Sequence, residues 1–363
     1  MEKLMKPVTI KGLTLKNPII MAPMTTKMSF FDGIVTQDEI EYYAMRSGQV
    51  GAVITGAANV ELDGKGWEGE LGVYEDRFIP KLSKLAAAIK RNGTKAILQI
   101  FHGGRMTNSQ ILRGAQPVSA SAVAAERPNA EVPRALESHE ILRLIQSFKQ
   151  ATQRAIAAGF DGVELHGANT YLLQQFFSPH SNRREDQWGG SLENRFAFIR
   201  EVVEATTSVV DREDFIVGYR FSPEELETPG IRFEDTLFLV DQLSAMKIDY
   251  LHISLNQFDK KSQDEHYQER SMMAYIHEKI DGRVPLIGVG GVQTKDQAEA
   301  LLEHAEAAAL GKILLTEPNW YAKVTNDEEN LVRHDLSRFD QEELRIGSGV
   351  WGFLESMMPK RLH

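Results

Sequence analysis

The sequence predicts an α/β protein of the (β/α)8 TIM-barrel class, because short strand-like segments alternate with helical patterns along most of its 363 residues. Most of the strand-like segments are apolar, as expected of parallel strands buried on both faces. Several of them end in polar or glycine-rich residues, which is typical of barrel strands that carry a site. The predicted strands cover 18–24, 51–58, 95–100, 162–165, 215–221, 250–254, 285–289 and 307–310.

Three segments are expected in addition to the barrel, which should run from about 18 to 317. Residues 7–17 alternate around a lysine–glycine pair and predict an N-terminal β-hairpin that acts as a plug or a lid. Residues 106–137 show no clear period and predict a long loop at the C-terminal face. The tail, about 318–363, has helical character. Because no composition shift or linker divides the chain, we expect residues 1–363 to form one domain.

Helices are expected between the strands, and several of them have recognisable N-terminal caps. A serine or threonine before an apolar-periodic run caps a helix, and a glutamate or glutamine three residues later completes a capping box. The candidate caps are Thr36 with Glu39, Ser138, Ser191, and Thr294 with Gln297.

The composition excludes several classes of function. A formal net charge of -10 offers no basic surface to nucleic acid, and no apolar run approaches the roughly 20 residues of a membrane helix. The chain has no cysteine, which removes disulfides, thiol nucleophiles, thiolate zinc sites and cysteine-ligated iron–sulfur clusters. The first residues lack the apolar segment of a signal peptide. We therefore expect a cytoplasmic protein without a metal site, a membrane contact or a nucleic-acid partner.

Polar residues gather where the predicted strands end, which is the working face of such a barrel. The stretch from Gly159 to Arg195 is the richest, since its strand opens into His166, Asn169 and Tyr171. The neighbouring strands add Thr25, Gln99, His102 and Arg220 to the same face.

Glycine-rich turns follow the last two predicted strands. Gly290 and Gly291 precede a capped helix, and Gly311 precedes Lys312. Backbone N–H groups exposed in such turns form the usual phosphate site of a barrel. The alternative is that these glycines only make tight turns between strand and helix.

Five sequence blocks follow one another with a characteristic order and spacing. The longest is GFDGVELHGANTYLLQQFFSPHSNRREDQWGGSLENR at 159–195, and the others are PIIMAPMT at 18–25, ILQIFHGGR at 97–105, GVGG at 288–291 and ALGK at 309–312. Together they resemble the Old Yellow Enzyme family of FMN-dependent ene-reductases. The resemblance implies a TIM barrel with FMN across its mouth and with NADH or NADPH as electron donor.

The resemblance implies flavin contacts at several strand ends. The residue matching Thr25 hydrogen-bonds the flavin near O4, Gln99 pairs with the pyrimidine edge, and Arg220 lies beside N1 and O2. Without a flavin, Thr25 would satisfy the backbone and Arg220 would form an ordinary ion pair with Glu224 or Glu225. The remaining implied cofactor contacts are Pro23, Met24, Ala57, His166, Gly290, Gly291, Gly311 and Lys312.

Three catalytic residues also follow from the resemblance. His166 and Asn169 match the donors that hold the carbonyl oxygen of the substrate and stabilise the developing enolate. Tyr171 matches the proton donor to Cα, since a phenol stays protonated at neutral pH. Without the resemblance, His166 could be a satisfied core histidine and Tyr171 an aromatic residue lining the pocket.

The resemblance therefore implies an FMN-dependent oxidoreductase that transfers hydride from NADH or NADPH through flavin N5 to an activated alkene, such as an α,β-unsaturated carbonyl compound. One alternative is a reductase of free flavin, oxygen, quinones or nitro compounds, which would use nearly the same barrel residues. The other is a flavin-free barrel, acting on a phosphorylated sugar or only binding a ligand. The oligomeric state stays open, a homo-oligomer included. We expect substrate specificity to depend on 106–137, Phe30, Phe31 and 257–270.

Overall fold

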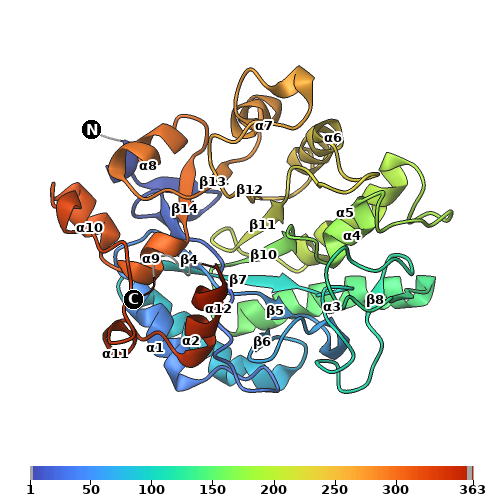
Figure 1. Ribbon diagram of the computed structural model, residues 1–363, viewed down its shortest axis with the longest axis horizontal. Helices are drawn as coiled ribbons and strands as arrows, with labels where there is room; N and C mark the ends of the chain where they lie inside the picture. Colours follow the sequence, from blue (N-terminus) through green and yellow to red (C-terminus); the bar gives the residue numbers. More distant parts are fainter. Residues whose placement is uncertain (1–2, 358–361, 363) are drawn as a thin grey trace.

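A closed barrel of eight parallel strands forms the centre of the computed structural model, which describes residues 3–357 and 362 (Figure 1). Going round the barrel, the strands follow the order β10, β11, β12, β13, β14, β3, β4 and β7. The barrel is closed because β10 pairs with β7 as well as with β11. The predicted fold class is confirmed. The barrel strands are β3 (Ile19–Met21), β4 (Ala52–Ile54), β7 (Lys95–Phe101), β10 (Gly162–Gly167), β11 (Ile216–Phe221), β12 (Tyr250–Ile253), β13 (Leu286–Val289) and β14 (Ala307–Leu310).

Helices surround the barrel in chain order, as Figure 1 shows. The helices that follow the strands are α1 (Gln37–Arg46), α2 (Ile79–Lys90), α3 (Ser138–Ala157), α4 (Leu172–Phe177), α5 (Leu192–Thr207), α6 (Phe233–Ser244), α7 (Met272–Ile280), α8 (Lys295–Leu301) and α9 (Lys312–Thr316). The tail adds α10 (Trp320–Thr325), α11 (Asp340–Glu343) and α12 (Ser348–Met357), in agreement with its predicted helical character. Among the residues described, no helix is both long and apolar enough to cross a membrane.

Short elements occupy the loops. Single 3-10 turns are η1 (Lys3–Met5), η2 (Leu62–Gly64), η3 (Asp76–Phe78), η4 (Glu265–Tyr267) and η5 (Glu329–Leu331). Two-residue strands are β5 (Ala58–Asn59), β6 (Leu71–Gly72), β8 (Val118–Ser119) and β9 (Arg134–Ala135). The pair β8 and β9 lies inside the predicted loop 106–137, which otherwise has no regular structure.

The N-terminal hairpin closes the amino end of the barrel. Strands β1 (Val8–Ile10) and β2 (Leu13–Leu15) pair in antiparallel fashion, and their apolar side chains join the cluster that fills the barrel interior. Gly12 at the turn donates its N–H to the carbonyl of Glu213, which lies just before β11 (3.0 Å). The hairpin is therefore a plug and not a lid, and the carboxyl ends of the strands are left for a site.

Two predicted strands are shorter than expected. The strand expected over 18–24 ends at Met21, since Pro23 has no N–H to continue a ladder. The segment 51–58 divides at Gly56 into β4 and β5. A Cβ at Gly56 would stand 2.7 Å from the carbonyl oxygen of Met24, so a glycine is needed where these two strand ends meet.

The predicted caps are confirmed at three helices and wrong at one. Thr36, Ser191 and Thr294 each accept the N–H of the third helical residue. The side chain of Gln297 in turn accepts the N–H of Thr294, which completes a capping box. At α3 the predicted cap Ser138 is instead the first helical residue. The N–H of Glu137 is taken by the carboxylate of Glu140 (2.8 Å), so the helix begins one residue earlier than the serine signal indicated.

Glu39 departs from the predicted capping box because its carboxylate turns into the core. The hydroxyls of Thr26 (2.6 Å) and Ser29 (2.5 Å) donate to it, which fixes the loop after β3 onto α1. The Glu39 side chain is fully buried. Burial raises its pKa to about 7, and the two hydroxyl donors offset only part of that effect. This carboxyl therefore loses its proton at a higher pH in the folded chain than in the unfolded chain.

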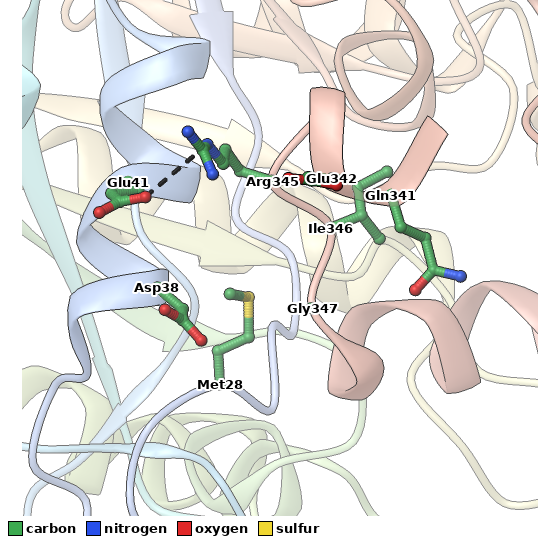
Figure 2. A pocket seen from close by; sticks show the side chains of 8 residues that line it. All are labelled: Met28, Asp38, Glu41, Gln341, Glu342, Arg345, Ile346 and Gly347. Atoms are coloured by element: carbon green, nitrogen blue, oxygen red, sulfur yellow. Dashed lines mark ion pairs between the residues drawn. The ribbon is translucent and has the colours of Figure 1, made fainter. Parts of the chain in front are cut away.

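The tail returns to α1. Arg46, a fully buried arginine of α1, donates to the carbonyls of Leu315 (3.3 Å) and Leu344 (2.9 Å). An open pocket lies beside this junction, and Figure 2 shows Arg345 of the tail pointing toward Glu41 of α1 across it, with Asp38 and Met28 on the same wall (Arg345–Glu41, 3.7 Å). None of the candidate site residues lines this pocket.

We predict that Glu39→Gln removes a pH dependence of stability. The folded-state pKa of about 7 lies above the usual 4.5, so the unfolded chain releases its proton first as the pH rises. The wild-type free energy of unfolding should then fall between about pH 4.5 and 7, by roughly 2–3 kcal/mol relative to the variant.

Urea unfolding at about pH 5 and pH 8 measures this difference. The matched control is Glu41→Gln on the same helix, which should keep the wild-type slope because its side chain is 42% exposed. A Glu39→Gln protein with the wild-type slope would contradict the prediction.

Candidate active site

Three predicted residues lie on consecutive barrel strands. Gln99 on β7, His166 on β10 and Arg220 on β11 are 2%, 3% and 7% exposed, so each is an interior polar group near the carboxyl end of its strand. The parallel register puts His166 directly opposite Arg220. The structure thus brings together the polar residues that the sequence only suggested would share a face.

His166 is held as a neutral hydrogen-bond donor. Its Nδ1 accepts the N–H of Ala168 (3.3 Å), so in the neutral ring the proton is on Nε2. Burial, and then the positive charge of Arg220, hold the pKa of His166 well below its usual value. The group offered at the mouth is therefore an uncharged Nε2–H.

Asn169 sits at the mouth with a left-handed backbone (φ 55°), and its exposed side chain is oriented by neighbouring strands. Its N–H donates to the hydroxyl of Ser222 (2.9 Å), and its Oδ1 accepts from the hydroxyl of Ser254 (3.1 Å). Because Oδ1 is engaged, the Nδ2 amide remains available to a ligand. Neither serine was predicted from the sequence.

Tyr171 lies beside His166 at the start of α4. The two rings are 4.9 Å apart between centroids, and the ring of Phe101 is also 4.9 Å from Tyr171. Trp67 adds a further aromatic face at 6.1 Å. Burial, and then the carboxyl of Glu70, raise the pKa of Tyr171 above its usual value, so its hydroxyl is protonated throughout the neutral range.

Arg220 is a buried cation without a partner among the described residues. Glu224 binds Ser262 and Gln263, and Glu225 accepts from Gln174 and Ser178, so the expected alternative of an ion pair with either glutamate is wrong. The Nε of Arg220 has no hydrogen-bond acceptor. A buried guanidinium is stable only with a compensating group, and the electron-rich pyrimidine edge of FMN fits that requirement.

The loops after β3 and β4 carry further residues that were predicted to contact the flavin ring. Thr25 is half-buried and its hydroxyl has no hydrogen-bond partner within the described part of the chain, so it does not satisfy the backbone as the alternative supposed. Ala57 is buried between β4 and β5. Pro23 and Met24 are half-buried, and the sulfur of Met24 would be 3.5 Å from a Cβ at Gly311.

The glycine turns lie side by side because β13 pairs with β14. Gly290 is required for packing as well, since a Cβ there would stand 2.1 Å from the nitrogen of Phe258. Gly291 has a φ of 69° and is exposed, and Lys312 is exposed at the first position of α9. The geometry accommodates both a tight turn and a phosphate site, and the phosphate assignment stays a prediction.

His102 does not join the candidate site. Its Nδ1 accepts the N–H of Gly104 (3.0 Å), and its Nε2 lies 3.4 Å from Asp63. Asp63 and the neighbouring Glu61 also face Arg143 of α3. A neutral imidazole whose Nδ1 accepts a backbone N–H has its proton on Nε2, so this nitrogen, which lies near Asp63 without a hydrogen bond to it, does not present a lone pair to a metal.

A second row of polar residues, which was not predicted from the sequence, lies beneath the mouth. Glu164 of β10 accepts from Gln99 (2.7 Å), and on β12 Tyr250 and His252 approach the same carboxylate. The available signal was alternation: polar residues stand two apart in strands that are otherwise apolar.

Comparisons with known proteins agree with this geometry. Residues 3–330 match the model of the NADH:flavin oxidoreductase / NADH oxidase family. The chain is 48% identical over 357 residues to an NADH:acrylate oxidoreductase of Vibrio harveyi, covering 96% of this chain and 35% of that protein. It is 41% identical over 355 residues to a probable NADH-dependent flavin oxidoreductase, YqiG, of Bacillus subtilis strain 168, covering 96% of this chain and 95% of that protein.

The fold is similar to that of morphinone reductase in complex with tetrahydroNAD, with a TM-score of 0.77, 29% identity, and coverage of 90% of this chain and 91% of that one. The chain spans little more than a third of the length of the first curated relatives that it matches. On these grounds it belongs to the NADH:flavin oxidoreductase / NADH oxidase family, the Old Yellow Enzyme family indicated by its motifs.

Proposed function

We propose that the chain reduces activated alkenes, with an α,β-unsaturated carbonyl or carboxyl compound as the substrate class. The observation that carries the proposal is the grouping of three donors at one side of the mouth: the Nε2–H of His166, the Nδ2 amide of Asn169 and the hydroxyl of Tyr171. The name of the Vibrio harveyi relative supports the class, since acrylate is an α,β-unsaturated acid.

In this proposal FMN lies over the interior polar residues. Gln99 and Arg220 would hold the pyrimidine edge, Thr25 and the backbone of Ala57 the O4 side, and Pro23 and Met24 the neighbouring edge of the ring. Gly290, Gly291, Gly311 and Lys312 would hold the phosphate. When bound, FMN supplies the redox chemistry, which is uptake of a hydride from the nicotinamide and its delivery to the alkene.

His166 and Asn169 would bind the oxygen of the substrate. Two donors aimed at one oxygen stabilise the negative charge that develops there when hydride adds at the β-carbon, an effect worth roughly 10²–10³ in rate per donor. Both donors are pre-positioned, His166 by Ala168 and Asn169 by Ser254. A neutral His166 also avoids a fixed charge that would bind any anion equally well.

Tyr171 would supply the proton to the α-carbon. Its raised pKa keeps the hydroxyl protonated, so the proton is present when the carbanionic carbon forms. The rings of Phe101, Trp67 and His166 pack around the Tyr171 ring and fix its position. The proton donor and the oxygen-binding pair would therefore act on one substrate, at the α-carbon and at the oxygen of the carbonyl group bonded to it.

We predict that Tyr171→Phe separates the two half-reactions. Reduction of bound FMN by NADH should keep its rate, because no proton donor is needed there, whereas reoxidation by an enone should slow by roughly 10²–10⁴. Anaerobic stopped-flow absorbance follows each half-reaction separately.

The matched control is Tyr275→Phe on α7, which also removes one phenolic hydroxyl but lies on the outer helical layer. It should leave both rates unchanged. If Tyr171→Phe reoxidised at the wild-type rate, Tyr171 would not be the proton donor.

We predict that Arg220→Met weakens FMN binding by at least about tenfold, since it removes the cation proposed to hold the pyrimidine edge while keeping an unbranched side chain. Fluorescence titration of the apoprotein with FMN measures the dissociation constant. Arg143→Met serves as the control, because Arg143 pairs with Glu61 on the outside of the barrel (3.0 Å). Equal affinity in Arg220→Met and the wild type would refute the assignment of Arg220.

A further inference from the structure

A fully buried carboxylate lies in the barrel floor, below the residues assigned to FMN. Glu164 stands two residues before His166 on β10 and directly opposite Gln99 in the register with β7. On the other side its strand neighbour is Gly218 of β11. Burying a charge in an apolar core is costly unless it is fully hydrogen-bonded and compensated, so this position calls for an explanation.

Glu164 is held by donors from two strands. Its Oε1 accepts from Gln99 Nε2 (2.7 Å), and its Oε2 accepts from Tyr250 Oη (3.1 Å) and lies 2.8 Å from His252 Nδ1. The ring of Tyr250 reaches it by crossing Gly218, where a Cβ would stand 1.9 Å from Tyr250 Cζ. Position 218 must therefore be a glycine, because any larger residue would clash with the ring of Tyr250.

The carboxylate is ionised although it is buried. Burial by itself raises the pKa of Glu164, but the hydrogen bonds from His252 and Gln99 and the positive charge of Arg220 outweigh it and keep the pKa below its usual value. Burial lowers the pKa of His252, so this imidazole is neutral and donates through Nδ1. The permanent charges in the floor are therefore the negative Glu164 and the positive Arg220.

These two charges do not cancel by direct contact. Within the described residues Arg220 forms no ion pair, so its guanidinium stays free toward the mouth while Glu164 acts on it through space. In the same way Glu164 occupies the Nε2 end of Gln99 and leaves the Oε1 end free. An amide that offers its oxygen accepts from an imide N–H such as that of a flavin pyrimidine.

We propose that Glu164 is a positioning residue that turns the oxygen of Gln99 toward FMN and, as the counter-charge of Arg220, lowers the reduction potential of the bound flavin. The proposal rests on FMN at the barrel mouth and not on the identity of the electron acceptor. Removing the negative charge leaves Arg220 uncompensated in a region of low dielectric. Negative charge arriving on the pyrimidine would then be stabilised more strongly.

The test is the midpoint potential of the FMN-loaded Glu164→Gln protein. We expect a more positive potential than in the wild type, so that the equilibrium for reduction by NADH shifts toward reduced flavin by on the order of tenfold. Spectroelectrochemical titration measures the potential directly and does not depend on turnover. An unchanged potential would overturn the proposal.

The matched control is Asp161→Asn, which neutralises another buried carboxylate at the amino end of the same strand. Asp161 accepts the N–H of Ala96 (2.9 Å) and pairs with Lys90 (2.7 Å), so it belongs to the opposite end of the barrel. The midpoint potential of FMN in the Asp161→Asn protein should equal that in the wild type. A shift as large as that of Glu164→Gln would show that any buried charge has this effect and would contradict a specific role.

Tyr250→Phe carries the test if Glu164→Gln does not retain FMN. It removes one of three donors to the carboxylate and leaves Gln99, His252 and Arg220 in place, with His166 above. Glu164 should then take up a proton at a higher pH, so the potential should rise above that of the wild type as the pH falls and coincide with it at high pH. A potential that follows the wild type at every pH would overturn the proposal.

Discussion

The register of four neighbouring parallel strands is the constraint on which the site depends. Pairing of β7, β10, β11 and β12 puts His166 opposite Arg220, and Arg220 opposite His252. Since side chains alternate between the interior and the helical layer, a slip of one residue in any strand would turn its polar groups into the apolar layer. The hairpin fills the other end of the barrel with apolar side chains, so the polar side chains of the interior can contact a ligand only at the mouth.

The parts predictable from the sequence are those decided locally. Strand-end polar residues such as His166 and Tyr171 are identified by their position after an apolar strand, and the barrel class follows from the alternation of elements. The caps Thr36, Ser191 and Thr294 are likewise short-range and are confirmed. Ser138 shows the limit of this reasoning, because the carboxylate of Glu140 accepts the N–H of Glu137, so Glu137 is the N-cap and Ser138 is the first helical residue.

The parts that escaped prediction depend on contacts between residues far apart in the chain. Ser254, which directly follows β12, binds Asn169 from 85 positions away, and Glu164 contacts His252 from 88 positions away. Glu39 was predicted to complete a capping box, but its carboxylate accepts hydrogen bonds from Thr26 and Ser29 in the core instead. No local pattern distinguishes these outcomes, because each is decided by which strand ends the closed barrel brings together.

An anaerobic absorbance titration of the FMN-loaded protein tests the central claim most directly. NADH or NADPH is added first, followed by an electron-poor alkene such as cyclohexenone or acrylate. We predict that the flavin bands bleach with the nicotinamide and return with the alkene. Bands that bleach but return only with oxygen, a quinone or free flavin would contradict an alkene as the acceptor, although the flavin oxidoreductase itself would stand.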